Sequence, residues 1–189
     1  MEEVVLVRHG ETEWSLSGQH TGRTDIPLTE VGRDQAERLR GQLDSRSFAR
    51  VLTSPLERAL QTCWLAGFGE GAEVTDDLRE WDYGEYEGLT TPRIRERRPG
   101  WNLWRDGCPG GESAGQVGAR ADRLIEPLRE LDGDAALFAH GHVLRVLAAR
   151  WVRLPAEDGA LLALSTATVS VLGWERETPV IRLWNQPAG

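Results

Sequence analysis

Near the start of the chain an apolar run, Val4–Val7, leads directly into Arg8 and His9. A cation and an imidazole at the end of a strand with a buried pattern indicate a binding site for an anion. Gly10 comes next, and a residue without a side chain lets the backbone approach a ligand closely. A lone histidine at a strand end is more often structural than catalytic. A second one, His140, ends another predicted strand, and together they favour a site at which His9 does chemistry.

Arg58 stands in the first turn of a predicted helix, where its charge opposes the helix dipole at a cost of about 0.3–1 kcal/mol. A bound anion would reverse that sign, because backbone amides and the guanidinium would then face it together. A surface ion pair with Glu57 explains this placement equally well.

The stretch LREWDYGEYEG is rich in acids, and a run of acids is usually a solvated face. Glu80, however, comes shortly after a predicted strand and precedes Trp81. A carboxyl against an aromatic surface tends to have a raised pKa, which a general acid needs. Glu80 is therefore a candidate proton donor.

The overall composition limits the partners of the chain. Its 189 residues carry a net charge of −8, which argues against nucleic acid or an anionic membrane as the main partner. All 22 cationic residues are arginine, which excludes a Walker-type phosphate loop and a lysine nucleophile. Neither Cys63 nor Cys108 has the spacing of a metal ligand. No segment has the pattern of a signal peptide or a membrane span, so we expect a cytoplasmic protein.

Short apolar runs alternate with helical patterns along the chain. Strands are predicted at 4–8, 50–54, 72–76, 134–142, 168–175 and 179–185. Helices are predicted at 28–45, 54–67, 112–131 and 143–152, with a short one near 93–98. The helix at 54–67 has the most complete start signals, with Ser54 as N-cap, Pro55 in the first position and Glu57 for a capping box. Pro127 is expected to kink or divide the helix in which it lies.

This alternation predicts the α/β class with three layers, a mostly parallel central sheet with helices on both faces. In such sheets ligands gather at the carboxyl ends of the strands. Arg8, His9, the segment 54–58 and His140 all fall at such ends. That coincidence is the main structural argument for a single site.

Residues 84–111 are rich in glycine, proline, arginine and tryptophan, and we expect them to form a loop-rich lid on a single domain of residues 1–189. Trp101, Trp104 and Arg105 are candidates for covering the substrate, with Arg105 meeting a second phosphate. Packing of these aromatic side chains down onto the domain is the commoner alternative.

Five stretches of the chain resemble sequences of the histidine phosphatase superfamily and occur in the same order. This superfamily includes the cofactor-dependent phosphoglycerate mutases. Four of the stretches are motifs, and the other is the segment between the first strand and the first helix. They are RHGET, GRTDIPLTEVG, TSPLERALQT, LREWDYGEYEG and FAHGHVLR. The resemblance is specific because all of these motifs occur together and in the same order as in the family. A single one of them would not be specific. Three segments, TEWSLSGQHTG, LREWDYGEYEGL and WNLWRDGC, are most similar to the branch of the superfamily that contains sedoheptulose-1,7-bisphosphatase and related acid phosphatases.

The resemblance implies a phosphoglycerate mutase-like fold and a role for each site residue. His9 is the nucleophile that becomes phosphorylated, and Glu80 protonates the leaving oxygen. The phosphoryl oxygens are held by Arg8, Arg58 and His140. Further ligand contacts fall at Ser15, Thr21, Gly22 and Gly141. Two positions depart from the pattern, because Ser15 and His142 stand where many members have asparagine, and His142 is best explained as a residue at a helix start. No metal and no cofactor are implied.

These residue types suit phosphoryl transfer. The transition state spreads negative charge over three oxygens, and the planar fork of arginine binds two oxygens while keeping its proton. A neutral imidazole can attack phosphorus if its other nitrogen is held as a donor, a role that the resemblance assigns to the Gly10 carbonyl. The expected reaction is hydrolysis of phosphomonoesters of small metabolites, sugar phosphates or bisphosphates among them, through a phosphohistidine, and best at mildly acid to neutral pH.

Three alternatives stay open. A mutase would return the phosphoryl group to its substrate, although the 59 residues (81–139) between Glu80 and His140 leave room only for a short lid, which favours hydrolysis. A non-catalytic phosphate-binding module is the second alternative, and a protein phosphatase is the third. The sequence also leaves open a homodimer and the identity of the physiological substrate.

Overall fold

The computed structural model describes residues 2–189 and has a six-stranded sheet at its centre. In sheet order the strands are β3 (Glu73–Val74), β2 (Arg50–Thr53), β4 (Ala135–Ala139), β1 (Val4–Arg8), β5 (Thr168–Glu175) and β6 (Thr178–Pro187). The first four run parallel, whereas β5 pairs antiparallel with both β1 and β6. The prediction of a mostly parallel sheet is confirmed.

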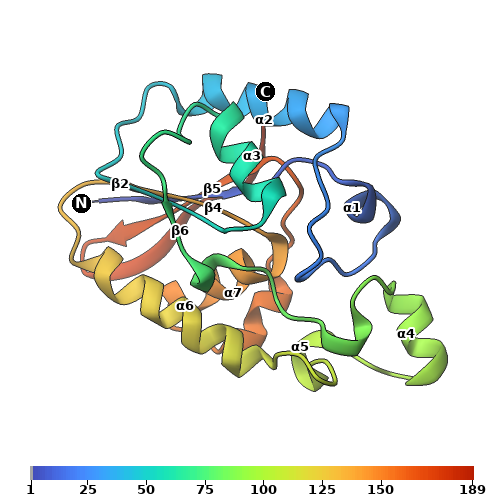
Figure 1. Cartoon of the computed structure of the whole chain (residues 1–189). Coiled ribbons are helices and arrows are strands. Elements are labelled where there is room, and N and C mark those ends of the chain that lie inside the picture. Colours follow the sequence, from blue (N-terminus) through green and yellow to red (C-terminus); the bar gives the residue numbers. More distant parts are fainter. Residues whose placement is uncertain (1) are drawn as a thin grey trace.

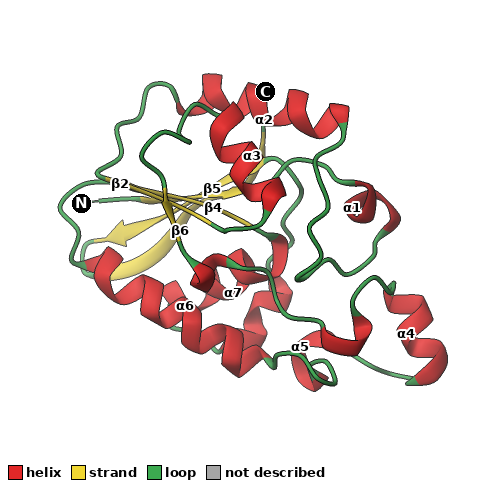
Figure 2. Cartoon of the chain, in the orientation of Figure 1, coloured by secondary structure: helices red, strands yellow, loops and turns green. Residues whose placement is uncertain are grey.

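Helices cover both faces of this sheet (Figures 1 and 2). The helices are α2 (Glu30–Leu43) and α3 (Glu57–Leu65) on one face, and α6 (Ala114–Arg129) and α7 (Gly141–Trp151) on the other. Successive residues of a strand point to opposite faces. Val5 and Val7 therefore join the core that includes α2 and α3, while Leu6 joins the core that includes α6 and α7. The three-layer α/β architecture is the predicted one.

Shorter elements connect these layers. They are α1 (Glu13–Ser17), α4 (Thr91–Arg97) and α5 (Leu103–Asp106), together with the 3₁₀ helices η1 (Asp76–Leu78), η2 (Gly84–Tyr86) and η3 (Ala156–Leu161). Within residues 2–189, no helix combines the length and the apolar character that crossing a membrane requires.

The helix after β2 begins later than its sequence signals indicate. α3 starts at Glu57 with Leu56 as N-cap and no side-chain cap, so the predicted cap at Ser54 and the capping box are wrong. The Ser54 hydroxyl instead accepts the backbone N–H of Leu56 and lies 2.7 Å from Nε2 of His140. A tertiary contact thus uses the side chain that a local rule assigned to the cap.

Two further elements differ from their predicted extent. The strand predicted at 72–76 is reduced to the two residues of β3, which lie at the edge of the sheet. α6 runs through Pro127 to Arg129 without dividing. Because Pro127 lies in the last turn, its missing N–H removes a single hydrogen bond close to an end that would fray in any case.

The segment 84–111 packs against the body of the protein. Its Trp101 side chain is almost completely buried, and Nε1 donates a hydrogen bond to the Gly107 carbonyl at 2.9 Å. Ile94 and Leu103 are buried in the same core as α6 and α7. Of the two arrangements considered for these aromatic residues, packing down onto the protein is the one that Trp101 adopts.

Candidate active site

The carboxyl ends of three neighbouring strands bring the predicted site residues together. Arg8 ends β1, His140 follows β4, and Arg58 lies in the first turn of the helix after β2. Because β2, β4 and β1 are adjacent in the sheet, side chains far apart in the sequence meet. The ring centroids of His9 and His140, for example, are 5.2 Å apart.

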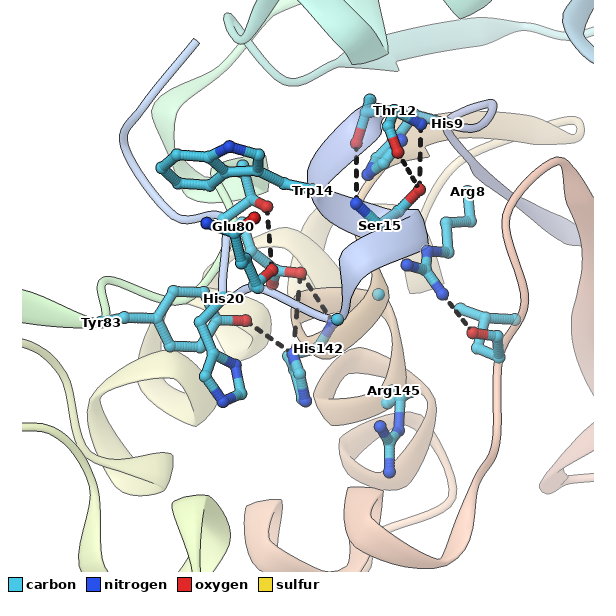
Figure 3. Close-up of a pocket in the computed structure, with 15 residues that line it drawn as sticks. Arg8, His9, Thr12, Trp14, Ser15, His20, Glu80, Tyr83, His142 and Arg145 are labelled. Atoms are coloured by element: carbon cyan, nitrogen blue, oxygen red, sulfur yellow. Dashed lines mark hydrogen bonds and ion pairs between the residues drawn. The ribbon is translucent and has the colours of Figure 1, made fainter. Parts of the chain in front are cut away.

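A pocket opens at these strand ends, and Figure 3 shows the side chains that line it. Its lining comes from the end of β1, the segment 12–21 around α1, and the start of α7, with Glu80 and Tyr83 completing one side. None of the residues 84–111 lines the pocket. The segment from which a lid was expected therefore lies beside the pocket, and the α1 segment forms its rim.

His9 is held in the form that a nucleophile needs. Its Nδ1 lies 2.7 Å from the Gly10 carbonyl, and since a carbonyl oxygen can only accept, Nδ1 carries the hydrogen. Burial, together with the charges of Arg58 and Arg8, holds the pKa of His9 well below its usual 6.5. The ring is therefore neutral, and Nε2 keeps a free lone pair in a side chain that lines the pocket.

Arg8 lines the same pocket and has one buried N–H group without a partner. Its Nη1 donates to the Leu164 carbonyl, but its Nε is buried without any acceptor among residues 2–189. A buried N–H of a cation without a partner is costly, about 1–3 kcal/mol or more. Because Nε has almost no accessible surface, a phosphoryl oxygen in the pocket would meet the outer nitrogens of this guanidinium. A Cβ on Gly141 would lie 3.2 Å from Cζ of Arg8, so this glycine leaves space for the guanidinium.

Arg58 and His140 lie behind His9 and do not line the pocket. The Arg58 guanidinium donates to Nδ1 of His140 and to the carbonyls of Thr21, Gly22 and Thr24. The other ring nitrogen of His140 is hydrogen-bonded to the Ser54 hydroxyl. Both side chains are thus oriented mainly by protein partners. A phosphoryl oxygen can reach His140 only by displacing one of those partners.

The Glu80 carboxyl is fixed by three backbone donors. Oε1 accepts the N–H groups of Trp81 and Val143, and Oε2 accepts that of His142, each at 2.9 Å. Two of these donors come from the first turn of α7, where free N–H groups and the helix dipole favour a negative charge. A carboxylate has about four lone-pair positions. Three are occupied here, and the one that remains free is on Oε2.

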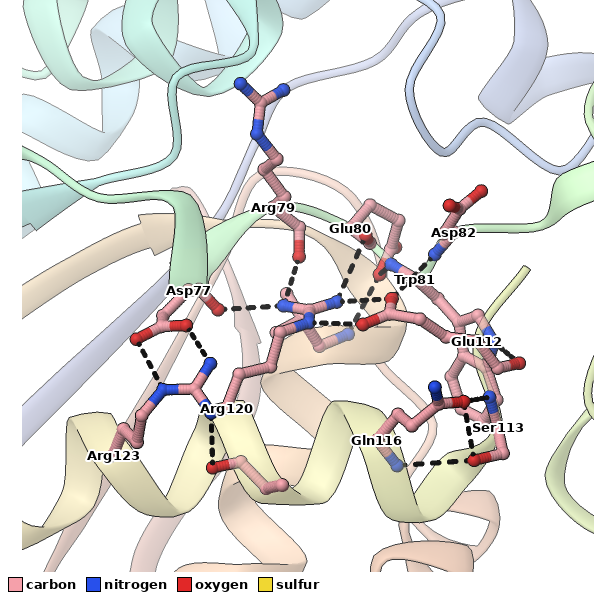
Figure 4. Close-up of polar contacts among 12 residues, drawn as sticks. Asp77, Arg79, Glu80, Trp81, Asp82, Glu112, Ser113, Gln116, Arg120 and Arg123 are labelled. Atoms are coloured by element: carbon pink, nitrogen blue, oxygen red, sulfur yellow. Dashed lines mark hydrogen bonds and ion pairs between the residues drawn. The ribbon is translucent and has the colours of Figure 1, made fainter. Parts of the chain in front are cut away.

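A second layer of contacts holds the backbone of Glu80 in place (Figure 4). Arg120 of α6 donates to the carbonyls of Asp77, Arg79 and Glu80, and it forms an ion pair with Glu112 at 2.8 Å. Glu112 in turn accepts the backbone N–H of Asp82 through its carboxyl. The expectation that the aromatic surface of Trp81 would dominate the surroundings of Glu80 misses this framework, because backbone N–H groups of Trp81 and α7 position the carboxyl while Arg120 and Glu112 hold the backbone beside it.

Three residues that the resemblance placed against the ligand have other partners. The Ser15 hydroxyl donates to the Thr12 carbonyl and completes the capping box of α1, so its hydrogen is not available to a ligand. Gly22 lies outside the pocket and donates its N–H to Glu87. Thr21 lines the pocket, but its hydroxyl donates to Gln19. The carbonyls of Thr21 and Gly22 position Arg58 instead.

The pocket also contains residues that sequence reasoning did not assign to it. His142 starts α7 as predicted, but its side chain lines the pocket together with Arg145, His20 and Tyr83. His142 and Arg145 are three residues apart and so share one face of the helix. That spacing within FAHGHVLR was the available signal. Arg105, expected to meet a second phosphate, is exposed and donates to Asp106 and Gly100.

Acid is expected to destabilise this protein through its imidazoles. Burial lowers the pKa of all four histidines, to about 4 for His20 and well below 6.5 for the other three. Unfolded imidazoles titrate near 6.5. Below that pH the unfolded chain binds more protons than the folded one, so the free energy of unfolding is retained above pH 6.5 and falls as the pH drops.

Urea denaturation between pH 7 and pH 5.5 measures this effect. The slope near pH 5.5 should approach uptake of about four protons on unfolding, each worth about 1.4 kcal/mol per pH unit. His20→Asn should reduce the uptake by about one proton. A free energy of unfolding that stays flat over this range would contradict the buried, neutral imidazoles.

Comparison with known proteins places this geometry in a family context. Residues 4–187 match the model of the histidine phosphatase superfamily (branch 1). An acid phosphatase of Mycobacterium tuberculosis is 45% identical over 192 residues, which cover 97% of this chain and 94% of that protein. Sedoheptulose 1,7-bisphosphatase of Saccharomyces cerevisiae is 41% identical over 182 residues, 79% of this chain and 67% of that protein. A solved open-reading-frame product of M. tuberculosis superposes with a TM-score of 0.95 at 42% identity, covering 100% of this chain and 99% of that one.

Proposed function

The chain belongs to the histidine phosphatase superfamily and is a phosphoric monoester hydrolase, and we propose that it hydrolyses phosphomonoesters of small metabolites through a phosphohistidine on His9. One observation carries the proposal above all. The ring of His9, whose Nε2 carries no hydrogen, and the side chain of Arg8 line the same pocket, which Glu80 also lines.

In the first step Nε2 of His9 attacks phosphorus, and the bond from phosphorus to the ester oxygen breaks. The bonding electron pair goes to the leaving oxygen, which takes a proton from Glu80. In the second step Glu80 accepts a proton from water as the water oxygen attacks phosphorus. The phosphorus–nitrogen bond breaks, His9 is regenerated, and inorganic phosphate leaves.

Positive charge around the transferred group comes from two arginines in this proposal. Arg8 lines the pocket and binds a phosphoryl oxygen directly through its guanidinium. Arg58 is fully buried behind the pocket and contributes its charge from there. His140 orients Arg58, with the hydrogen bond from Nε of Arg58 to Nδ1 of His140 at 3.1 Å. Fixed cations of this kind stabilise charge that develops on the oxygens in the transition state.

The substrate class that we propose is a sugar phosphate with a second anionic group. Arg145 lines the pocket and lies at the opposite end from His9 in Figure 3. Its guanidinium stacks on Trp104, 4.6 Å from the ring centroid, and donates to the carbonyls of Gly159 and Ala160. Nη1 has no acceptor among residues 2–189. A similar yeast protein is named for a bisphosphorylated sugar, which supports this assignment.

Arg145→Met should remove the preference for a second phosphate. We expect kcat/KM for a sugar bisphosphate to fall about 10–100-fold relative to the matching monophosphate, because a charge-assisted hydrogen bond contributes about 1.5–3 kcal/mol. Arg105→Met is the matched control, since Arg105 is exposed and does not line the pocket. Equal losses for the mono- and the bisphosphate would remove Arg145 from substrate selection.

Turnover of a substrate panel tests the function itself. The panel contains sugar mono- and bisphosphates, a phosphopeptide, and 3-phosphoglycerate with a bisphosphoglycerate primer. We expect inorganic phosphate from the sugar esters and an acid-labile, base-stable label on the protein during turnover. Isomerisation of 3-phosphoglycerate far above phosphate release would identify a mutase instead. Fastest turnover of the phosphopeptide would identify a protein phosphatase, and binding without turnover a non-catalytic module.

A further inference from the structure

Tyr83 and His142 form a partly buried pair next to the proposed proton donor. The Tyr83 hydroxyl lies 2.6 Å from Nδ1 of His142, and Tyr83 is 1% exposed. The same Nδ1 is 3.8 Å from Oε2 of Glu80. In Figure 3, dashed lines join His142 to Tyr83 on one side and to Glu80 on the other. The catalytic cycle described above uses neither Tyr83 nor His142.

The direction of the hydrogen bond in this pair follows from the available partners. Among residues 2–189 the Tyr83 hydroxyl has Nδ1 of His142 as its single hydrogen-bond partner. Burial raises the pKa of Tyr83 well above 10 and lowers that of His142 well below 6.5, so the hydroxyl keeps its hydrogen and the ring is neutral. The hydroxyl therefore donates to Nδ1, and the ring hydrogen sits on Nε2.

The alternative tautomer would interfere with Glu80. With the hydrogen on Nδ1, His142 would present an N–H donor 3.8 Å from Oε2, within reach of a small ring rotation. Oε2 has a single lone-pair position that is not already filled by a backbone N–H. A fourth donor there would occupy the position that has to carry the transferable proton.

We propose that Tyr83 is a positioning residue that fixes the tautomer of His142, keeping Oε2 of Glu80 free to carry the proton and presenting the Nε2–H of His142 to the substrate. This inference rests on the proposed function, because it assumes that Glu80 protonates the leaving oxygen. In this proposal the hydroxyl of Tyr83 affects the transfer of the Glu80 proton, although Tyr83 itself never carries that proton.

The dependence of the rate on the leaving group tests the proposal. An alkoxide needs a proton to leave, whereas p-nitrophenolate leaves without one. In Tyr83→Phe the ratio of kcat/KM for a sugar phosphate to that for p-nitrophenyl phosphate should fall about tenfold, a part of the 10²–10⁴-fold that general acids contribute. The ratio compares two substrates in one preparation, so it does not depend on the fraction of folded protein.

The chain offers a matched control, because it has only two tyrosines. Tyr86 packs edge-on against Trp101 at 5.3 Å and lies outside the pocket lining. Tyr86→Phe should leave the ratio as in wild type. In a His142→Ala background, Tyr83→Phe should cause no further change in the ratio, because the donor that it releases is gone.

The outcomes separate this inference from the proposed function. Suppose that wild type hydrolyses both esters and that the ratio in Tyr83→Phe stays within about twofold of the wild-type ratio. This result overturns the role of Tyr83 and leaves the proposed phosphatase function standing. A further fall of the ratio in the His142→Ala background also overturns it, since Tyr83 would then act by another route. Wild-type protein that hydrolyses neither ester overturns the proposed function and this inference together.

Discussion

His9→Ala should lower kcat/KM for every phosphomonoester by on the order of 10⁴-fold to 10⁶-fold, the scale of losses when a covalent nucleophile is removed. Alanine has no lone pair to attack phosphorus, and Arg8 and Glu80 retain their own partners. The residual rate would come from binding and charge stabilisation alone. The measurement is phosphate release in parallel with quenched labelling of the protein.

A matched control distinguishes loss of the nucleophile from loss of an imidazole in the pocket. His20 also lines the pocket, but its Nε2 lies 3.2 Å from the Thr91 hydroxyl and no arginine charge contributes to its lowered pKa. His20→Ala should cost less than about tenfold in kcat/KM, the scale of one ordinary hydrogen bond. Acid-labile labelling that persists in His9→Ala would assign the phosphorylated position to another residue.

Glu80→Gln should have the second largest effect, and its size should depend on the leaving group. The amide carries no transferable proton, so hydrolysis of sugar phosphates should fall by about 10²–10⁴-fold. Hydrolysis of p-nitrophenyl phosphate should fall far less, because its leaving group needs no proton. Steady-state rates for a series of esters with increasingly basic leaving groups would measure this dependence.

The same substitution has a cost in stability that must be measured alongside the rates. The side-chain amide has one acceptor oxygen for the three backbone N–H groups that the carboxylate now accepts. At least one donor is left unpaired, at a cost of about 1–3 kcal/mol. Glu85→Gln is the control, because Glu85 is exposed and lies in the same acidic stretch. Equal losses for aryl and alkyl esters in Glu80→Gln would exclude Glu80 as the general acid.

Much of the site could be predicted because its residues follow short apolar strands. The pattern of Val4 to Val7 predicts a buried strand, and the parallel arrangement then requires that Arg8 and His9 meet whatever ends the neighbouring strands. His140 follows β4 by the same rule. These inferences depend on local periodicity and on strand direction, both of which can be read along the chain.

Other features depend on side-chain orientation and could not be predicted in that way. Ser54 has every local property of an N-cap, yet it bonds His140, which follows β4, the strand next to β2 in the sheet. Ser15 has a hydroxyl suited to a ligand, yet it completes a capping box. In each case two hydrogen-bond partners compete for one short polar side chain, and the packing of distant segments decides between them.

What the amino-acid sequence determined by itself is the α/β class and the family, and it predicted a single site formed by Arg8, His9, Arg58, Glu80 and His140. Only the tertiary structure decided which of these line the pocket and which lie behind it, and it added His142, Arg145 and Tyr83 to the walls. The physical reason is the distance along the chain over which each kind of interaction acts. Hydrophobic periodicity is a property of a few consecutive residues, whereas the partner of a buried polar atom is chosen by segments that meet only when the sheet and its helices have packed together.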